Sequence, residues 1–211
     1  MPTVQGSDNF GHGTATAPPF SLIFGAPTIV TSPVAPNVGS KTLSVVSTGS
    51  DIGARYNITG TPGYGWTAIY FRITSDWQDI YFLTLGATAG NSAILALNAS
   101  RQVYGFFTGG GASSVPSAAL SLDTWYWIEM ITQFSATTRT TWYRLNGVDQ
   151  GSFDKSGESS GTCDHAQFLS YALNDAGGTL LNGYWMWGSA TSSTDWYGEP
   201  DIVTVNVSVN F

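Results

Sequence analysis

The chain is nearly free of the residues from which surface helices are built. Of its 211 residues only 7 are Lys or Arg and 14 are Asp or Glu, whereas 25 are Gly and 14% are aromatic. Long charged side chains suit helices, whereas Thr, Tyr, Trp and Val suit strands. Short apolar or alternating runs recur between turn clusters, as β-sandwiches and barrels require. We therefore expect an all-β protein.

The alternating runs locate the expected strands. They are Thr28–Ser32, Lys41–Ser47, Ala54–Ile58, Thr67–Ile73, Asp79–Leu85, Ser92–Leu97, Gln102–Phe107, Tyr126–Gln133, Thr140–Leu145, Asp149–Phe153, Ala166–Ser170, Gly183–Trp187 and Ile202–Val209.

The clearest local pattern is a hairpin. Thr141–Leu145 runs into Asn146-Gly147 and then into Val148–Phe153. Asn-Gly accepts positive φ at both central positions, and the resulting twist matches the flanking strands. We expect a two-residue turn at Asn146 and Gly147.

Residues 1–20 differ from the rest. They are rich in Gly, Thr and Pro and end in Ala17-Pro18-Pro19-Phe20. Consecutive prolines favour an extended polyproline geometry. We predict an extended N-terminal arm over 1–20 and one sandwich domain over 21–211. Two interpretations of the arm stay open: a frayed terminus, or a strap onto a neighbouring subunit.

Charge and cysteine content exclude several classes. The net charge of −7 argues against nucleic-acid binding, which needs a basic footprint. One Cys cannot form an intramolecular disulfide, and no Cys/His set suits a zinc site. No apolar run approaches the roughly 20 residues that span a bilayer. The N-terminus lacks the pattern of a secretion signal, so we expect synthesis in a cytoplasm and no membrane insertion.

Three stretches resemble a known family. They are Val38-Gly-Ser-Lys-Thr-Leu-Ser-Val45; Leu120–Glu129 with the hairpin Leu145–Phe153; and Tyr184–Asp195 followed by Gly198-Glu-Pro and the last strand. Together they resemble the laminin-G-like, concanavalin A-like jelly rolls of bacteriophage tail and other virion proteins, over roughly residues 28–211. The family often has acidic residues where this chain has Tyr184 and Trp185, which argues against a metal site there.

The resemblance implies a two-sheet antiparallel jelly roll in a minor tail or tail-tip protein of a virion. Its partners would be other tail proteins, further copies of itself and host-surface glycan. Two alternatives stay open: a purely structural capsid decoration protein, and a glycoside hydrolase of concanavalin A-like fold.

A hydrolase would need two carboxyl groups about 5–9 Å apart. The chain has three glutamates, Glu129, Glu158 and Glu199, and none has the spacing of the hydrolases that share this architecture. We interpret Glu129 as structural, paired to Arg72 or Arg144, and expect no enzyme.

A nucleophilic enzyme has a weaker basis. Cys163 and His165 alternate in one short segment and would share a face only if that segment is extended, while His12 lies in the arm. Because no third group orients them, we interpret Cys163 as a small buried hydrophobe.

Calcium has an unspecific signal, and no other cofactor is expected. Asp76 and Asp79 flank Trp77-Gln78, and Asn174-Asp175 lies in a turn. Hard cations take such oxygen ligands, but Asp and Asn are also ordinary turn residues.

Carbohydrate or partner binding has a better physical basis, because aromatic rings with a polar handle suit half-wet sites. The candidates in or beside loops are Tyr64, Trp66, Trp77, Trp196 and Tyr197, and Trp185 and Trp187 share one face of a strand. Four other aromatic residues are expected to fill the core instead: Phe71, Tyr81, Trp125 and Trp142.

Overall fold

The computed structural model describes residues 1–11, 20–36, 41–48, 52–60, 62–75, 80–87, 90–172 and 176–200. Within these ranges the chain forms strands and no helix, so no helix there is able to cross a membrane. The strands are β1 (Thr3–Asp8), β2 (Leu22–Phe24), β3 (Thr28–Val30), β4 (Thr42–Thr48), β5 (Ile52–Asn57), β6 (Tyr64–Ile73), β7 (Ile80–Ala87), β8 (Ala93–Leu97), β9 (Val103–Phe107), β10 (Trp125–Gln133), β11 (Arg139–Leu145), β12 (Val148–Lys155), β13 (Cys163–Ala172) and β14 (Ala176–Ser189).

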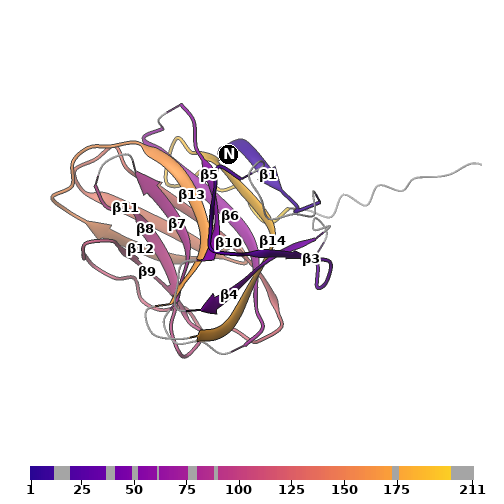
Figure 1. Ribbon diagram of the computed structural model, residues 1–211. Coiled ribbons are helices and arrows are strands. Elements are labelled where there is room, and N and C mark those ends of the chain that lie inside the picture. Colours follow the sequence, from indigo (N-terminus) through magenta and orange to yellow (C-terminus); the bar gives the residue numbers. More distant parts are fainter. Residues whose placement is uncertain are drawn as a thin grey trace, which may run out of the picture.

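The strands form two antiparallel sheets packed face to face (Figure 1). The eight-stranded sheet has the order β12-β11-β10-β6-β14-β4-β3, with β1 paired to β14. The six-stranded sheet has the order β2-β5-β13-β7-β8-β9. Neighbouring strands far apart in the chain, such as β5 beside β13, give the long crossovers of a jelly roll. The predicted all-β, two-sheet jelly roll is confirmed.

One large apolar core fills the space between the sheets. Alternate residues of the strands point into it, as on β11, where buried and half-buried positions alternate along the whole strand. Phe71, Phe82 and Phe168 are fully buried there. Burying apolar surface is the main stabilising contribution to such a sandwich.

The predicted strands between residues 28 and 187 are present, although β13 and β14 are longer than expected. The hairpin turn is confirmed: Asn146 and Gly147 have φ of 49° and 76°, the left-handed values that the turn requires. Strands β1 and β2 were not expected, because Thr3–Asp8 and Leu22–Phe24 lie in stretches without clear alternation. The strand predicted at Ile202–Val209 lies outside the described residues.

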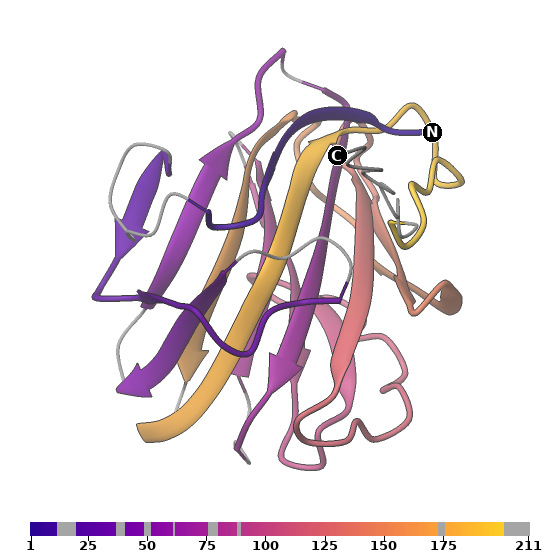
Figure 2. The ribbon, with the colours of Figure 1, turned by 90° about the vertical axis from the view of Figure 1, so that its right-hand side faces the viewer.

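The N-terminal segment contributes to the sandwich. Strand β1 runs antiparallel to β14 of the same chain, alongside it in Figure 2. Phe10 and Phe20 are buried in the core, with their ring centroids 6.3 Å apart. The segment predicted as an arm over 1–20 therefore supplies one strand and two core side chains, and residues 12–19 lie outside the described part.

The prediction of core aromatics is right for Phe71 and wrong for the other three. Tyr81 is half-buried on the outer face of the six-stranded sheet, where its ring contacts Phe106. Trp125 and Trp142 pack against a second, smaller apolar cluster on the outer face of the eight-stranded sheet. Alternation shows which residues share a face, but it does not show which face is the inner one.

Candidate functional site

The outer face of the six-stranded sheet carries the candidate site. The strand register places one residue from each of five adjacent strands in a row across it. The row consists of Arg55, Gln167, Thr84, Ile94 and Phe106. Strands lie about 4.8 Å apart, so the row is about 19 Å long. Thr84 and Ile94 are buried in its middle, which leaves a half-buried polar end and a half-buried aromatic end.

The aromatic end consists of three half-buried rings, Tyr81, Tyr104 and Phe106. The ring of Phe106 lies 4.8 Å from that of Tyr81 and 5.8 Å from that of Tyr104, centroid to centroid. Tyr81 and Tyr104 are both opposite Ala96 of β8, which is fully buried between them. The three rings form a continuous aromatic surface.

An open groove of about 410 Å³ adjoins these rings, and we call it the aromatic groove. This volume is in the range of small-molecule sites, about 300–1,000 Å³. Its lining combines aromatic rings with hydroxyl groups and glycine backbone: Tyr81, Phe106, Phe107, Thr108, Gly109, Gly110, Gly111 and Ser113.

Three glycines, Gly109 to Gly111, give the groove its backbone wall. Their φ angles are 77°, 89° and 129°, which side-chain-bearing residues rarely adopt. At Gly111 a Cβ would also lie 3.0 Å from the carbonyl oxygen of Asp154. The run of glycines therefore lets peptide groups, rather than side chains, line this side of the groove.

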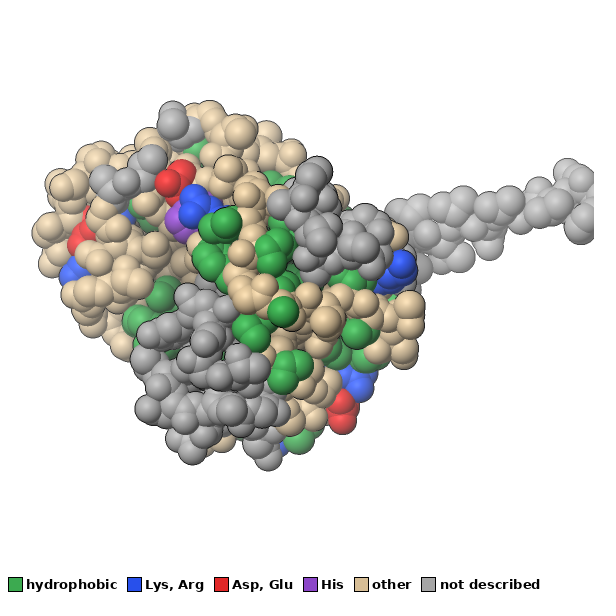
Figure 3. All heavy atoms as spheres, viewed as in Figure 1, with side chains coloured by type: hydrophobic (Ala, Val, Ile, Leu, Met, Phe, Trp, Pro, Cys, Tyr) green, Lys and Arg blue, Asp and Glu red, His purple; other side chains and the backbone are tan. Residues whose placement is uncertain are grey.

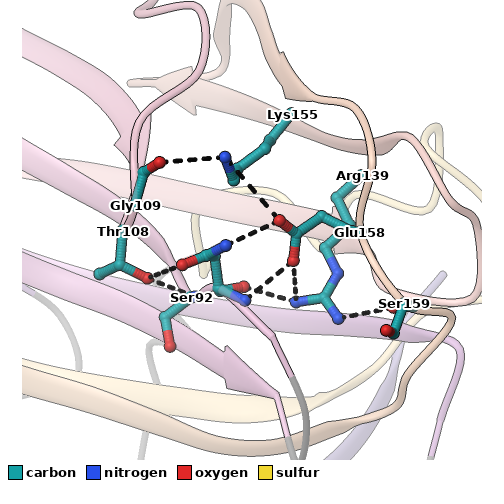
Figure 4. Close-up of polar contacts among 8 residues, drawn as sticks. Ser92, Thr108, Gly109, Arg139, Lys155, Glu158 and Ser159 are labelled. Atoms are coloured by element: carbon teal, nitrogen blue, oxygen red, sulfur yellow. Dashed lines mark hydrogen bonds and ion pairs between the residues drawn. The ribbon is translucent and has the colours of Figure 1, made fainter.

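A buried ion pair holds that wall in place (Figure 4). Arg139 is fully buried, and its guanidinium lies 3.7 Å from the carboxylate of Glu158. Glu158 accepts hydrogen bonds from the backbone N–H and the side-chain amide of Asn91, at 3.0 and 2.7 Å. Lys155 lies 3.9 Å from the same carboxylate and donates to the carbonyl oxygen of Gly109 at 3.0 Å. The ion pair thus reaches the groove through Lys155.

Asn91 gives a second connection to the groove. Its side-chain oxygen accepts a hydrogen bond from the Thr108 hydroxyl at 3.2 Å, and that hydroxyl accepts one from the N–H of Ser92 at 2.9 Å. The N–H of Asn91 and its side-chain amide, with help from Arg139 and Lys155, hold the pKa of Glu158 below its usual range, although burial opposes this. Glu158 is therefore ionised at neutral pH and its charge is compensated.

The polar end of the face consists of Arg55 on β5 and of Gln167 and His165 on β13. Arg55 and Gln167 are directly opposite, and His165 is on the diagonal, opposite Asn57. The ring of His165 lies over Gly86 of β7, where a Cβ would come within 1.9 Å of Cε1. Figure 3 shows a histidine at the surface with basic and acidic side-chain atoms beside it.

His165 is neutral at physiological pH. Burial lowers the pKa of its imidazole, the charge of Arg55 lowers it further, and Asp164 opposes both. The Nδ1 atom contacts the Asp164 carboxylate, so the proton of the neutral ring belongs on Nδ1 and Nε2 is the acceptor. Asp164 is therefore engaged with His165.

Four of the aromatic residues predicted to bind a ligand come together on the opposite side of the molecule. Tyr64, Trp66, Trp196 and Tyr197 lie on the outer face of the eight-stranded sheet, under or within the segment 190–200. Trp66 is fully buried, and its ring contacts Tyr197 with a centroid distance of 5.8 Å. Trp196 packs under the guanidinium of Arg144, 4.6 Å from its ring centroid.

Glu129 is structural, but its expected pairing is wrong. Its Oε1 atom accepts hydrogen bonds from the backbone N–H groups of Tyr197 and Gly198, at 2.9 and 3.1 Å. Arg72 pairs instead with Asp123 at 2.8 Å, and Arg144 is on Trp196. A buried carboxylate is best satisfied by fixed N–H donors, which the following segment supplies.

A second glutamate of this face, Glu199, is also engaged. It accepts a hydrogen bond from the hydroxyl of Tyr70, and both burial and this carboxylate raise the pKa of that hydroxyl, which remains a donor. Glu129 is fully buried. Both carboxylates thus hold the segment 190–200 against the eight-stranded sheet.

Trp185 and Trp187 lie on the inner side of β14. Trp185 is fully buried in the core and donates to the hydroxyl of Thr67 at 2.9 Å. Trp187 is stacked on Tyr56, with 3.7 Å between ring centroids and 5° between planes. Their rings are packed against the protein itself. Trp77 lies outside the described residues.

The expectation that Cys163 and His165 share a face is wrong. A register shift separates them in the pairing of β13 with β7. Such a bulge adds one residue to a strand and reverses the alternation. Cys163 is buried in the core, as interpreted, and burial raises the pKa of its thiol. His12 lies outside the described residues.

The calcium prediction concerns Asp76, Asp79, Asn174 and Asp175, all outside the described residues. Within the described ranges, no three His, Cys, Asp or Glu side chains are arranged to hold a metal ion.

The sequence interpretation missed Arg55, Tyr104 and Phe106 and assigned Tyr81 to the core. A signal for two of them exists: in Val103–Phe107, Tyr104 and Phe106 alternate with residues of the other face. Because both faces of this strand carry aromatic or apolar residues, the sequence does not show which face points outward.

No family model matches this chain, and no curated protein sequence matches it. Solved structures do match its fold. The cellulose-induced protein Cip1 has a TM-score of 0.63 at 15% identity, with 90% of this chain and 98% of that one covered. The transglycosylase Crh5 in complex with NAG has a TM-score of 0.58 at 11% identity, covering 88% and 83%. A mutant of the alginate lyase Aly36B in complex with an alginate trisaccharide has 0.55 at 8%, covering 71% and 81%.

The TM-scores show a shared fold, and at identities this low the similarity extends to the fold alone. The chain is a β-sandwich of the jelly-roll type, and the structures similar to it include a transglycosylase and a lyase.

Proposed function

We propose that this chain is a carbohydrate-binding domain whose ligand lies in the aromatic groove of the six-stranded sheet. The observation that carries the proposal is the half-exposed aromatic surface of Tyr81, Tyr104 and Phe106 beside an open groove of about 410 Å³.

The chemistry of the groove suits a sugar. The C–H face of a pyranose stacks on an aromatic ring, and its hydroxyl groups need polar partners. Thr108 and Ser113 offer hydroxyl groups, and Gly109 to Gly111 offer peptide groups. The buried ion pair of Arg139 and Glu158 supports this glycine wall through Lys155, which contacts both Glu158 and Gly109. A site that is held in place before binding loses less conformational entropy when the ligand binds.

Binding without hydrolysis is supported by the lining of the groove. Among the described residues that line it there is no carboxylate, whereas glycoside hydrolysis normally needs two. Glu129 and Glu199 are on the other sheet and hold the segment 190–200.

The setting of this domain in a phage tail tip, with other tail proteins as partners, stays a prediction from the sequence resemblance. A tail-tip position would display the groove toward host-surface glycan. Tail proteins that pack against this domain would then need to leave the six-stranded sheet uncovered.

Affinity electrophoresis of the purified chain in gels that contain different soluble polysaccharides tests the proposal. We expect retardation by at least one polysaccharide. Tyr81→Ala and Phe106→Ala should each weaken binding about tenfold or more, because central aromatic contacts are worth about 2 kcal/mol or more.

Tyr197→Ala is the matched control, because it removes a partly exposed aromatic ring from the opposite face. Thermal unfolding of every variant checks that the fold is kept. Retardation of the Tyr81→Ala and Phe106→Ala variants equal to that of the parent chain would contradict the proposal.

A further inference from the structure

Arg55 is a basic side chain on the outer face of the six-stranded sheet. It is half-buried, and its Nε atom is buried without a hydrogen-bond partner. Arg72 pairs with Asp123, and Arg139 pairs with Glu158, whereas the side chain of Arg55 makes no hydrogen bond or ion pair with the described residues; Arg144 also lacks one, but its guanidinium lies over the ring of Trp196. A partly desolvated guanidinium without an anion is unfavourable unless it serves a ligand.

The neighbours of Arg55 among the described residues do not supply a countercharge. Gln167, directly opposite on β13, is neutral and offers two amide N–H donors. Leu22, opposite on β2, is apolar. The nearby carboxylate of Asp164 contacts His165 instead.

Arg55 and Gln167 thus present adjacent donors on an open sheet face. A guanidinium fork matches a planar carboxylate in two parallel hydrogen bonds, and the amide of Gln167 adds a third donor. His165, held over Gly86, adds an acceptor at Nε2 for a neighbouring hydroxyl group. Acidic sugars meet these needs, because they carry an anionic group beside hydroxyl groups that donate and accept hydrogen bonds.

We propose that Arg55 and Gln167 bind the anionic group, carboxylate or sulfate, of an acidic saccharide whose other residues occupy the aromatic groove. This inference rests on the proposed function and names its ligand class. The row from Arg55 to Phe106 is about 19 Å long, so the ligand is an oligosaccharide or polysaccharide rather than one sugar.

The net charge of −7 makes the proposal demanding. An acidic polymer is repelled by the chain as a whole, so selective binding needs a local cation. Screening by salt reduces the long-range repulsion more than it reduces a direct, partly buried contact.

The experiment compares three polymers of similar length by affinity electrophoresis or calorimetry: a polyuronate, a sulfated glycan and a neutral glucan. We expect tighter binding of the polyuronate or the sulfated glycan than of the neutral glucan. Whichever of the two binds more tightly identifies the anionic group. Arg55→Gln should weaken binding of that polymer about tenfold and leave binding of the neutral glucan unchanged.

Two further variants make the result specific. Arg72→Gln removes the same charge from the other sheet and should change nothing. Arg55→Lys keeps the charge but loses the fork, so it should bind with an affinity between those of the parent chain and Arg55→Gln.

The outcomes separate the two proposals. Equal binding by Arg55→Gln and the parent chain, or a preference for the neutral glucan, would overturn this inference and leave the groove as a neutral-sugar site. Absence of binding of the parent chain to these three polymers and to every other polysaccharide tested would overturn the proposed function together with this inference.

Discussion

The two outer faces of this sandwich are both rich in aromatic residues, and they differ in what covers them. On the eight-stranded sheet, Trp66, Tyr70 and Trp127 are buried beneath the segment 190–200, which Glu129 holds by two backbone N–H groups. On the six-stranded sheet, Tyr81 and Phe106 are half-exposed beside an open groove. Aromatic content therefore does not show exposure by itself: a segment of the chain covers the rings of one sheet, whereas Tyr81 and Phe106 of the other are half-exposed in the part of the chain that the structure describes.

The faces also differ in how their carboxylates are used. Glu129 and Glu199 fasten a cover to the eight-stranded sheet. Glu158 instead supports the loop that forms the wall of the groove and leaves the groove open. On the eight-stranded sheet the glutamates hold a covering segment in place, whereas beside the six-stranded sheet Glu158 supports the wall of an open groove.

The largest effect is expected from breaking the buried ion pair of Arg139 and Glu158 beside the aromatic groove. Glu158→Gln leaves Arg139 buried without its countercharge, and breaking a buried pair in this way costs about 3–5 kcal/mol. We expect a free energy of unfolding lower by that amount in urea denaturation, together with weaker saccharide binding because the wall at Gly109 loosens. Unchanged stability would show that the pair does not support the groove.

A control for that result removes both charges. Arg139→Met combined with Glu158→Met leaves no unpaired buried charge, so it should be less destabilised than Glu158→Gln. A double variant as unstable as the single one would indicate that lost packing, rather than the unpaired charge, explains the effect.

The next effect is expected at the cover of the other face. Glu129→Ala removes the acceptor of two backbone N–H groups, and hydrogen bonds to charged groups are worth about 1.5–3 kcal/mol. We expect a loss of stability in that range, with faster proteolysis within 190–200 and unchanged saccharide binding. Lost saccharide binding in a folded Glu129→Ala variant would indicate that the saccharide site lies on the eight-stranded sheet, which would contradict the account.

The fold follows from the sequence to a large extent because it depends on alternation and turn chemistry. Asn146-Gly147 predicts its hairpin from local φ preferences alone, and the apolar runs from β3 to β14 predict their strands. Strand β1 is not predicted by the sequence, because it has no apolar alternation of its own and is held by pairing with β14. Such pairing between distant segments has no local signature.

The site follows from the sequence much less. Tyr81 and Phe106 are 25 residues apart, and only the order β7-β8-β9 places their rings 4.8 Å apart. Arg55 and Gln167 are opposite only because β5 pairs with β13. Loop position favoured Trp196 and Tyr197, but it could not show that their segment folds back on the sheet, where the two rings pack against Arg144 and Trp66.

The loss of stability at low pH should be smaller than the effects of these substitutions, and it should depend on Glu158 beside the aromatic groove. The pKa of Glu158 is lower in the folded chain than its ordinary value of 4.5. A carboxyl group of this kind stabilises the fold above its unfolded pKa, and the contribution is lost as the pH falls through its folded pKa. We expect stability to decline below about pH 4.5, and the decline to be shallower in Glu158→Gln, by thermal unfolding at stepped pH. Parallel profiles would contradict the assignment.

The smallest effect is expected from the exposed edge of the cover. In this account Trp196 and Tyr197 pack against Arg144 and Trp66 rather than against a ligand. The double variant Trp196→Ala/Tyr197→Ala should keep its saccharide affinity within about twofold, with a modest loss of stability. Loss of binding without loss of fold would show that this edge contacts the ligand.

The most direct test of the central claim is a two-dimensional NMR titration of the labelled chain with the saccharide that binds it. The glycine amides of Gly109 to Gly111 and the rings of Tyr81, Tyr104 and Phe106 report on one face, and those of Tyr64, Trp196 and Tyr197 report on the other. The account predicts saturable shifts confined to the first set. Shifts confined to the second set would contradict it.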